Sequence, residues 1–289
     1  MASMRDIKRR KTSIQSTQQI TKAMKLVSTV KLQRTKAHAE SAKPYFDSMY
    51  NTVCSVLSRT GEVQHPYLQG GGSGKKAVVV ITSNRGLAGG YNSNVVKMIE
   101  RGELKKEDLR IYAIGKKGRE TLARHGYEVA ESDLDEVMEN PTYADAMRIS
   151  QMLLKDFENG EISEIHLAYT FYKNTVSHVP TLLQLLPVSI DKDDVKEESE
   201  ASSKALMSFE PNEEEALNLI VPKYVTSLIY GALIQAIASE NAARMQAMDS
   251  ATSNAEEMID KLSLQYNRAR QGSITQELTE IIAGAEAIS

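Results

Sequence analysis

The sequence contains few large aromatic side chains and few cysteines. It contains no tryptophan, 4 phenylalanines and a single cysteine, Cys54, although 41% of its 289 residues are hydrophobic. One cysteine excludes an internal disulfide and a multi-thiolate metal site, so we expect Cys54 to be a small apolar side chain that is at least half-buried. An apolar content supplied by small aliphatic side chains and methionine favours long helices lying close together over a broad globular core.

Glycine is absent from Ser3 to Arg59, and Pro44 is the single proline in that stretch. Apolar side chains recur there at helical spacing. They are Ile20, Met24, Val27, Leu26 and Val30. The stretch predicts one helix of about 85 Å at about 1.5 Å per residue, with a bend at Pro44.

The region from Pro211 to the end repeats this character. Its first apolar stripe consists of Leu217, Val221, Tyr224 and Leu228, and an alanine-rich middle follows. An unbroken helix here would be about 115 Å long, with Pro222 near its start, where proline costs least. The uncharged run from Tyr224 to Ser239 is too short to span a bilayer comfortably.

The middle of the chain has a different pattern. Residues 61–76 are glycine-rich and predict a loop and flexible linker. The apolar run 77–82 is typical of a strand buried on both faces of a parallel sheet. Strand and helix patterns then alternate, which predicts a compact α/β domain with crossover helices. The further strands are 110–114, 165–172 and 179–186, and the helices are 92–101, 116–125 and 143–159.

These patterns predict α/β structure plus long helices: an antiparallel coiled coil of the N- and C-terminal helices with a central Rossmann-like α/β domain. Each terminal segment has an apolar stripe too narrow for a core but wide enough for one helical partner, so the two are expected to pair with each other as a shaft. The predicted boundaries are 1–60 for the N-terminal helix, 61–76 for the linker, 77–190 for the α/β domain, 191–210 for a charged connector and 211–289 for the C-terminal helix.

Charge is divided unevenly along the chain. Residues 1–43 contain eleven Lys or Arg against two acidic residues, whereas the whole chain has a net charge of −3. A basic segment joined to an acidic remainder points to a partner. The segment could meet acidic protein surfaces, or as the alternative it could bind nucleic acid or act as a scaffold, although it lacks interleaved aromatic residues. The N-terminus has no apolar region typical of a secretory signal.

The residues offer little for catalysis. The glycine-rich turn Asn84–Gly90 follows a strand and precedes a helix, where a phosphate-binding loop would lie. It fits neither the P-loop pattern, because Tyr91 stands where the second glycine belongs, nor the dinucleotide pattern, because Ala88 replaces a glycine. A structural turn is the better interpretation and nucleotide binding the alternative. The five histidines lack metal-ligand spacing. We expect no catalytic residue, cofactor or metal site in this chain.

Three separated motifs resemble the gamma subunit family of bacterial F-type ATP synthases. They are Ser16–Val27 (STQQITKAMKLV), Ser83–Asn92 (SNRGLAGGYN) and Ile274–Ala285 (ITQELTEIIAGA), and Glu240–Met245 and Tyr266–Gln271 add to them. The resemblance covers nearly the whole chain, and Ala88 stands where many relatives carry cysteine. It implies the central stalk, or rotor, of a proton-translocating ATP synthase, a non-catalytic subunit that couples rotation of a membrane ring to three catalytic sites.

The resemblance also implies roles for particular residues. Arg270, Gln271, Thr275 and Glu277 match contacts to catch loops of the surrounding ring, and Met24 and Lys25 match the shaft region facing a beta-subunit lever. Phe209, Glu210 and Pro211 match a foot on the rotor ring. Ile274, Leu278, Ile281, Ile282 and Ile288 match an apolar bearing tip.

The implied partners are three alpha and three beta subunits, the epsilon subunit and the membrane rotor ring, with no nucleic acid. ATP, ADP and Mg would bind to the alpha and beta subunits, and this chain would bind no cofactor. The chain would lie at the cytoplasmic face of the bacterial plasma membrane as a peripheral protein, associated with the membrane indirectly through the ring.

Overall fold

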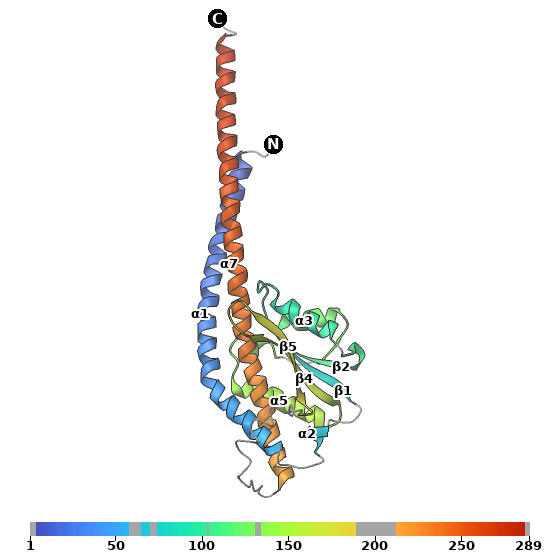
Figure 1. Cartoon of the computed structure of the whole chain (residues 1–289). Helices are drawn as coiled ribbons and strands as arrows, with labels where there is room; N and C mark the ends of the chain where they lie inside the picture. The colour runs from blue at the N-terminus through green and yellow to red at the C-terminus, as the bar shows by residue number, and fades with distance from the viewer. Residues whose placement is uncertain are drawn as a thin grey trace. The chain divides into compact units, whose positions relative to one another are not determined.

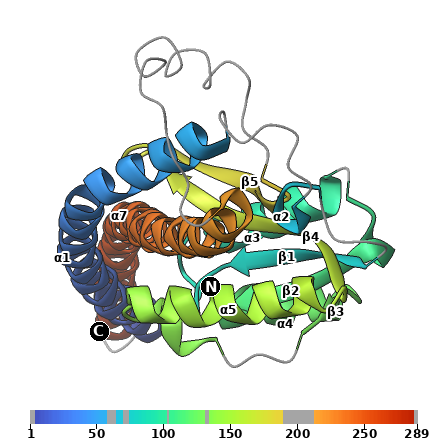
Figure 2. The same ribbon diagram turned by 90° about the horizontal axis from the view of Figure 1, so that it is seen from below.

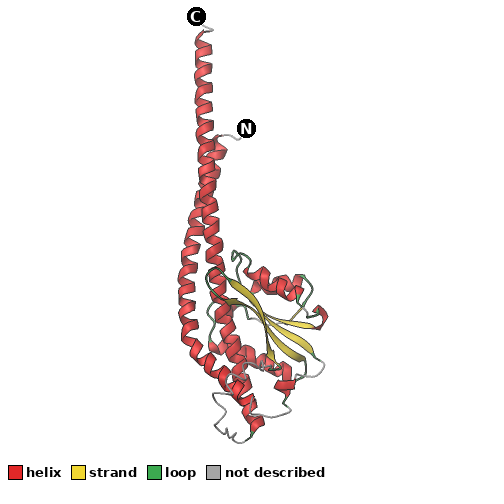
Figure 3. Ribbon diagram, in the orientation of Figure 1, coloured by secondary structure: helices red, strands yellow, loops and turns green. Residues whose placement is uncertain are grey.

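The computed structural model describes residues 4–57, 65–69, 74–102, 104–130, 134–188 and 212–286. Its two longest elements are helix α1 (Met4–Leu57) and helix α7 (Glu213–Glu286). Both agree closely with the predicted terminal helices. The described strands all fall between these two helices in the sequence (Figure 3). Pro44 lies inside α1, which curves in its second half without breaking (Figure 1).

The chain divides into two compact units. Unit 1 comprises Met1–Thr29 and Arg244–Ser289, and unit 2 comprises Val30–Ala243. Both long helices therefore contribute to both units: the first part of α1 and the last part of α7 make up unit 1, and their other halves belong to unit 2.

Unit 2 contains a five-stranded sheet in the order β3-β2-β1-β4-β5. The strands are β1 (Lys75–Ile81), β2 (Leu109–Ile114), β3 (Glu128–Val129), β4 (Ile162–Tyr172) and β5 (His178–Leu186). All neighbours run parallel except β4 and β5, which pair antiparallel. The connection of residues 173–177 is too short for a crossover helix, so the last strand returns as a hairpin and not as another parallel strand.

Helices α3 (Tyr91–Arg101), α4 (Lys116–Arg124) and α5 (Tyr143–Glu158) confirm the three helices predicted between the strands. Sequence patterns missed the two-residue strand β3, the 3-10 turns Lys106–Asp108 and Glu136–Met138, and the short helix α2 (Pro66–Gln69) within the expected linker. Such short elements carry too few residues for a recognisable period.

Two apolar layers enclose the sheet. Val78 and Val80 of β1 pack with Val95 of α3 on one face, and Val79 packs with Ile149 of α5 on the other. Alternate residues of β1 are thus buried on opposite faces, as predicted for this run. Figure 2 shows α5 and the first turns of α7 around the sheet.

The first half of α7 has a different role from the one expected. Leu217, Val221, Val225 and Ile229 are at most 1% exposed and belong to the same apolar core as Val79. Of the predicted stripe, Leu217 and Val221 belong to this core and Leu228 packs against it, and the core includes Val56 of α1 as well as residues of β1 and α5, so the stripe meets more than the single helix expected. The sheet has two apolar faces, and the α7 stripe joins α5 in covering one of them.

By length and composition, α7 is the one described helix that could cross a membrane, and 56% of its most apolar window is buried inside the structure. Packing against the sheet accounts for this apolar content, because the window includes a core helix of unit 2.

Candidate functional site

In unit 1, the two helices meet along a seam with a spacing of three and four residues. On α1 the least exposed positions recur as a heptad pattern, and Ile7, Thr21 and Ser28 are the most buried of them, at 7%, 7% and 2% exposed. On α7 the matching positions include Met248 and Ala255, at 5% each. Such spacing is that of a coiled coil.

Three polar contacts fix the direction of the pairing. They are Gln18 Nε2 to Glu256 Oε1 at 3.0 Å, Thr21 Oγ1 to Thr252 Oγ1 at 2.8 Å, and Lys25 Nζ to Asp249 Oδ1 at 2.5 Å. As the residue number rises along α1 it falls along α7, so the helices are antiparallel, as the sequence predicted. Lys25 and Asp249 remain 40% and 57% exposed, and an ion pair so open to water contributes about 0–1 kcal/mol.

The seam is not the apolar stripe that the sequence suggested. Ile20, Leu26 and Val27 are 60%, 61% and 57% exposed, and Val30, where unit 2 begins, is 57% exposed. Polar or small side chains occupy the seam at this level instead. The prediction that the stripe faces the C-terminal helix is therefore wrong: seam and stripe have the same period but lie on different faces of α1, and periodicity alone cannot distinguish them.

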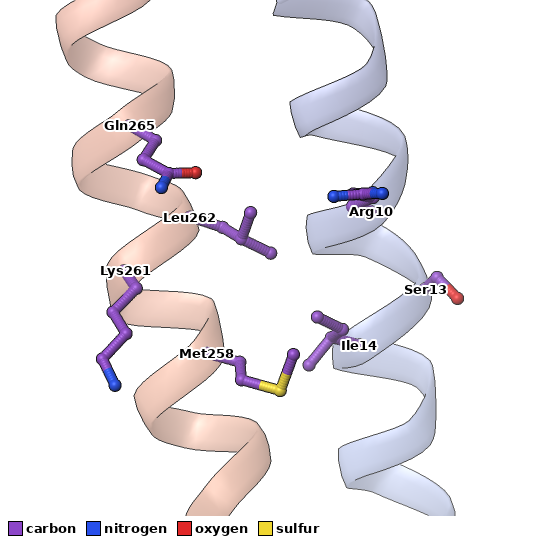
Figure 4. Close-up of a pocket in the computed structure, with 7 residues that line it drawn as sticks. All are labelled: Arg10, Ser13, Ile14, Met258, Lys261, Leu262 and Gln265. Carbon is purple, nitrogen blue, oxygen red and sulfur yellow. The ribbon is translucent and has the colours of Figure 1, made fainter. Parts of the chain in front are cut away.

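Beside the seam, the packing leaves a gap of about 350 Å³ (Figure 4). Ile14 of α1 and Met258 and Leu262 of α7 point into it, with Arg10 and Lys261 at its rim. A gap of this size between apolar side chains means that they form fewer dispersion contacts than in a closed seam. Unit 1 is thus paired by apolar side chains such as Ile7 and Met248, together with polar contacts and small residues.

The last turns of α7 expose a second apolar surface. Ile274, Leu278, Ile281 and Ile282 are 47%, 55%, 68% and 60% exposed. Ile288, the fifth residue predicted for this tip, lies outside the described residues. The four described residues thus share an exposed helical segment.

The predicted ring-contacting residues Arg270, Gln271, Thr275 and Glu277 are all exposed and lie on adjacent turns of α7. The Thr275 hydroxyl donates to the Gln271 carbonyl at 2.9 Å, and the Ser273 hydroxyl to the Glu277 carboxylate at 3.3 Å. These hydrogen bonds stay within the helix, which leaves polar groups on its surface that a partner could contact.

Of the two residues predicted to face a lever, Met24 is half-buried on α1, and Lys25 forms the ion pair described above. Phe209, Glu210 and Pro211 lie outside the described residues, as does the predicted connector 191–210.

The glycine-rich turn after β1 is tied into unit 2 by its own polar groups. The Asn84 amide donates to the Asp135 carbonyl at 2.7 Å, and its oxygen accepts from the Lys116 backbone N–H at 3.1 Å. The Thr82 hydroxyl accepts from the Gly118 N–H at 2.8 Å. These bonds fasten the turn after β1 to the start of α4 and to the Asp135 backbone.

Sequence reasoning missed the glycines that make this arrangement possible. Gly115 has φ +96°, and a Cβ there would overlap the Thr82 carbonyl oxygen; a Cβ on Gly118 would lie 2.6 Å from the Thr82 hydroxyl. A glycine pair spaced by three residues directly after a strand was the available signal. No group of three or more potential metal ligands occurs among the residues that the structure describes.

Comparisons with known proteins cover the whole chain. The family model described as ATP synthase matches residues 3–288. The chain is 63% identical over 292 residues to the ATP synthase gamma chain of Lachnoclostridium phytofermentans, and each chain is covered completely. It is 42% identical to the ATP synthase gamma chain of Alkaliphilus metalliredigens, over 99% of this chain and 98% of the relative.

Among solved structures, the fold is similar to a chain of the Euglena gracilis mitochondrial ATP synthase (OSCP/F1/c-ring, rotational state 3). The TM-score is 0.67 and the identity 19%, over 99% of this chain and 94% of that one. A chain of the Tetrahymena thermophila mitochondrial ATP synthase (central stalk/c-ring) has a TM-score of 0.57 and 24% identity, over 80% of this chain and 99% of that one. At these identities the likeness establishes the fold.

Proposed function

Because this chain belongs to the ATP synthase gamma chain family, we propose that it is the central-stalk (rotor) subunit of an F-type ATP synthase. In this role it couples ion-driven rotation of a membrane ring to conformational changes at three catalytic sites in a ring of alpha and beta subunits. The chain acts mechanically and contributes no catalytic residue.

The observation that carries the proposal is the apolar outer surface of unit 1. Ile20 and Val27 on α1, and Leu278 and Ile281 on α7, are each at least 55% exposed, whereas Thr21 and Ser28 are buried in the seam between the helices. In a free-standing coiled coil, the apolar residues would instead face the partner helix. Exposed apolar residues that recur on both helices of one unit are typical of an interaction site, so a surrounding protein sleeve is the fitting partner.

An apolar tip also suits a turning part. Contacts of Ile274, Leu278, Ile281, Ile282 and Ile288 with an apolar sleeve would be non-directional, so no single orientation is locked by a specific bond. Phe209, Glu210 and Pro211 would form the foot that contacts the membrane rotor ring.

The polar residues that precede and alternate with the apolar tip residues would supply the orientation-dependent contacts. Arg270, Gln271, Thr275 and Glu277 offer donors and acceptors on one exposed segment. Driving a two-state site from mostly open to mostly closed requires about 5.5 kcal/mol of differential contact energy. A few hydrogen bonds to charged groups, at about 1.5–3 kcal/mol each, are of that size.

Met24 and Lys25 would face a lever of the beta subunit. The Lys25–Asp249 pair is exposed and weak, so Lys25 could exchange its partner for an acidic group of the ring as the shaft turns.

The remaining partners follow from the same role. ATP, ADP and Mg would bind to the alpha and beta subunits, three of each, and this chain would also contact epsilon and the membrane ring. It would lie at the cytoplasmic face of the plasma membrane, attached through the ring. Nucleic-acid binding by the basic N-terminal segment is not favoured, because the relatives named as ATP synthase gamma chains match over the full length.

The test replaces Gln271→Leu and Glu277→Ala together and measures ATP turnover of the complex reconstituted with alpha and beta subunits. We expect turnover to fall at least about tenfold, the effect of losing about 1.4 kcal/mol of differential contact, while the isolated chain keeps its helical content.

Gln276→Leu with Glu280→Ala is the matched control. Gln276 and Glu280 form a hydrogen-bonded pair (3.0 Å) on the same exposed helix but at a different angle around its axis. Equal turnover in both variants would remove Gln271 and Glu277 from the mechanism. Failure of the unmodified chain to assemble with alpha and beta subunits would refute the rotor assignment itself.

A further inference from the structure

A closed set of aromatic contacts joins three helices within unit 2. The chain has 12 tyrosines and 4 phenylalanines, and four of these rings meet here. Tyr45 and Phe46 come from α1, Tyr143 from α5 and Tyr230 from α7. The ring centroids lie 6.1 Å apart for Tyr45–Phe46, 6.3 Å for Tyr45–Tyr143, 5.8 Å for Tyr143–Tyr230 and 6.1 Å for Phe46–Tyr230.

The geometry is that of attractive ring pairs. The Tyr45–Tyr143 and Tyr143–Tyr230 planes are inclined by 87° and 72°, close to the edge-to-face arrangement that places the positive edge of one ring against the negative face of another. Each ring contacts two others, so every ring supports the position of its neighbours.

The junction is also closely packed. Tyr143 lies beside Tyr45 of α1 and Ser227 of α7, and Ser227 is only 2% exposed. Burial is the main cause that raises the pKa of Tyr143. Thr142 and Asp145 form a capping box at the start of α5, which fixes the backbone that carries Tyr143.

The junction matters because α1 and α7 are held very unequally in unit 2. A long stretch of α7 lies in the sheet core, where Val221, Val225 and Ile229 are fully buried. Among the described side chains of α1, none between Leu32 and Val53 is buried. Over those turns, Tyr45 and Phe46 contact rings of α5 and α7, and farther along the helix Val56 is buried in the same core as Val221.

We propose that Tyr45, Phe46, Tyr143 and Tyr230 form an aromatic joint that fastens α1 to α5 and α7. As a local fastening, the joint stands on the contacts above. Its mechanical consequence rests on the proposed function: torque entering unit 2 reaches α7 through a long buried stretch but reaches the middle of α1 through the joint, so the four residues are positioning residues that make both helices turn together.

The first experiment uses the isolated full-length chain and measures amide hydrogen exchange. Replacing Tyr45→Ala and Phe46→Ala together should accelerate exchange in the second half of α1 about tenfold or more, because two of the four rings are lost. Exchange in β1 should not change. Tyr45→Phe, which keeps the ring, should restore most of the protection when Phe46 is intact.

Phe171→Ala is the matched control, because Phe171 is 41% exposed and has no ring contact among the described residues. An unchanged rate in α1, a rate equal to that of the control, or an equal rise in β1 would each overturn the joint as a local fastening.

The second experiment measures ions pumped per ATP hydrolysed by the membrane-bound complex. The double variant should keep hydrolysing ATP but pump fewer ions per ATP, by about twofold or more, whereas Tyr45→Phe and Phe171→Ala should pump normally. Loosened α1 with unchanged pumping would overturn the mechanical role alone. An unmodified chain that never assembles would instead refute the proposed function and leave the exchange result standing.

Discussion

Two glycines after β2 allow a test of how the turn after β1 is built. Replacing Gly115 by alanine introduces two separate unfavourable effects. One is backbone strain, because the residue has φ +96°, and the other is a steric clash, because its new Cβ would overlap the Thr82 carbonyl. Gly118→Ala introduces one, a contact of 2.6 Å with the Thr82 hydroxyl, which also accepts the Gly118 N–H. Gly160→Ala introduces backbone strain without a steric clash, since Gly160 has φ +75° and nothing lies within 4 Å of an added Cβ.

The expected costs follow from these differences. A side chain at positive φ costs about 1–2 kcal/mol, so Gly160→Ala should lower the free energy of unfolding by that amount. Forcing atoms into a packed interior costs about 1–3 kcal/mol, which is the expectation for Gly118→Ala because Thr82 is fully buried. Gly115→Ala should cost at least the sum, about 2–5 kcal/mol, a large part of a typical total stability.

The measurement is urea unfolding followed by circular dichroism, together with amide exchange of β1 and β2. The expected order of destabilisation is Gly115→Ala, then Gly118→Ala, then Gly160→Ala. Faster exchange should be confined to the carboxyl ends of β1 and β2 for the two glycines that touch Thr82.

Two results would refute this reasoning. If Gly115→Ala cost no more than Gly160→Ala, the close approach to Thr82 would carry no energy. If Thr82→Ser, which removes a methyl group next to Gly118, did not relieve Gly118→Ala at all, the predicted clash would be wrong, because the methyl carbon lies 2.8 Å from the added Cβ.

Four further changes test other parts of the chain. Thr142→Ala should cost about 1 kcal/mol by urea unfolding, since it removes the α5 capping box. Hydrogen bonds from Thr142 lower the pKa of Asp145 below its usual 3.8. The ionised carboxylate therefore stabilises the fold above about pH 4, and this contribution is lost as the pH falls through the lowered pKa of the folded state. Asp145→Asn should remove that acid dependence of stability. Lys25→Ala should change stability by less than about 1 kcal/mol, and a larger loss would show that the pair with Asp249 is not a surface contact. Gly272→Ala should raise the helicity of the last turns of α7, because nothing lies near an added Cβ and alanine favours a helix over glycine by about 1 kcal/mol. Unchanged helicity would mean that these turns are already fully helical in the isolated chain.

The sequence predicted most of the architecture because its signals are local and repeated. The glycine-free stretch ending near Arg59 and the long helical pattern after Pro211 became α1 and α7, and the alternating runs between them became the strands and helices of unit 2. The antiparallel pairing also followed, since two long helices without cores of their own need a partner. The roles of Arg270 and Gln271 were inferred from family resemblance and remain predictions.

The tertiary structure decided which partner each apolar stripe has. Periodicity shows that Val221 and Ile20 lie on regular helical stripes, but a period does not identify the surface that covers the stripe. Val221 is buried in the sheet core, whereas Ile20 is exposed and the seam beside it is built from Thr21 and Ser28. The aromatic joint likewise joins residues nearly 200 positions apart, which no local pattern could reveal. Burial depends on contacts between distant segments, so it became visible only once the chain was folded.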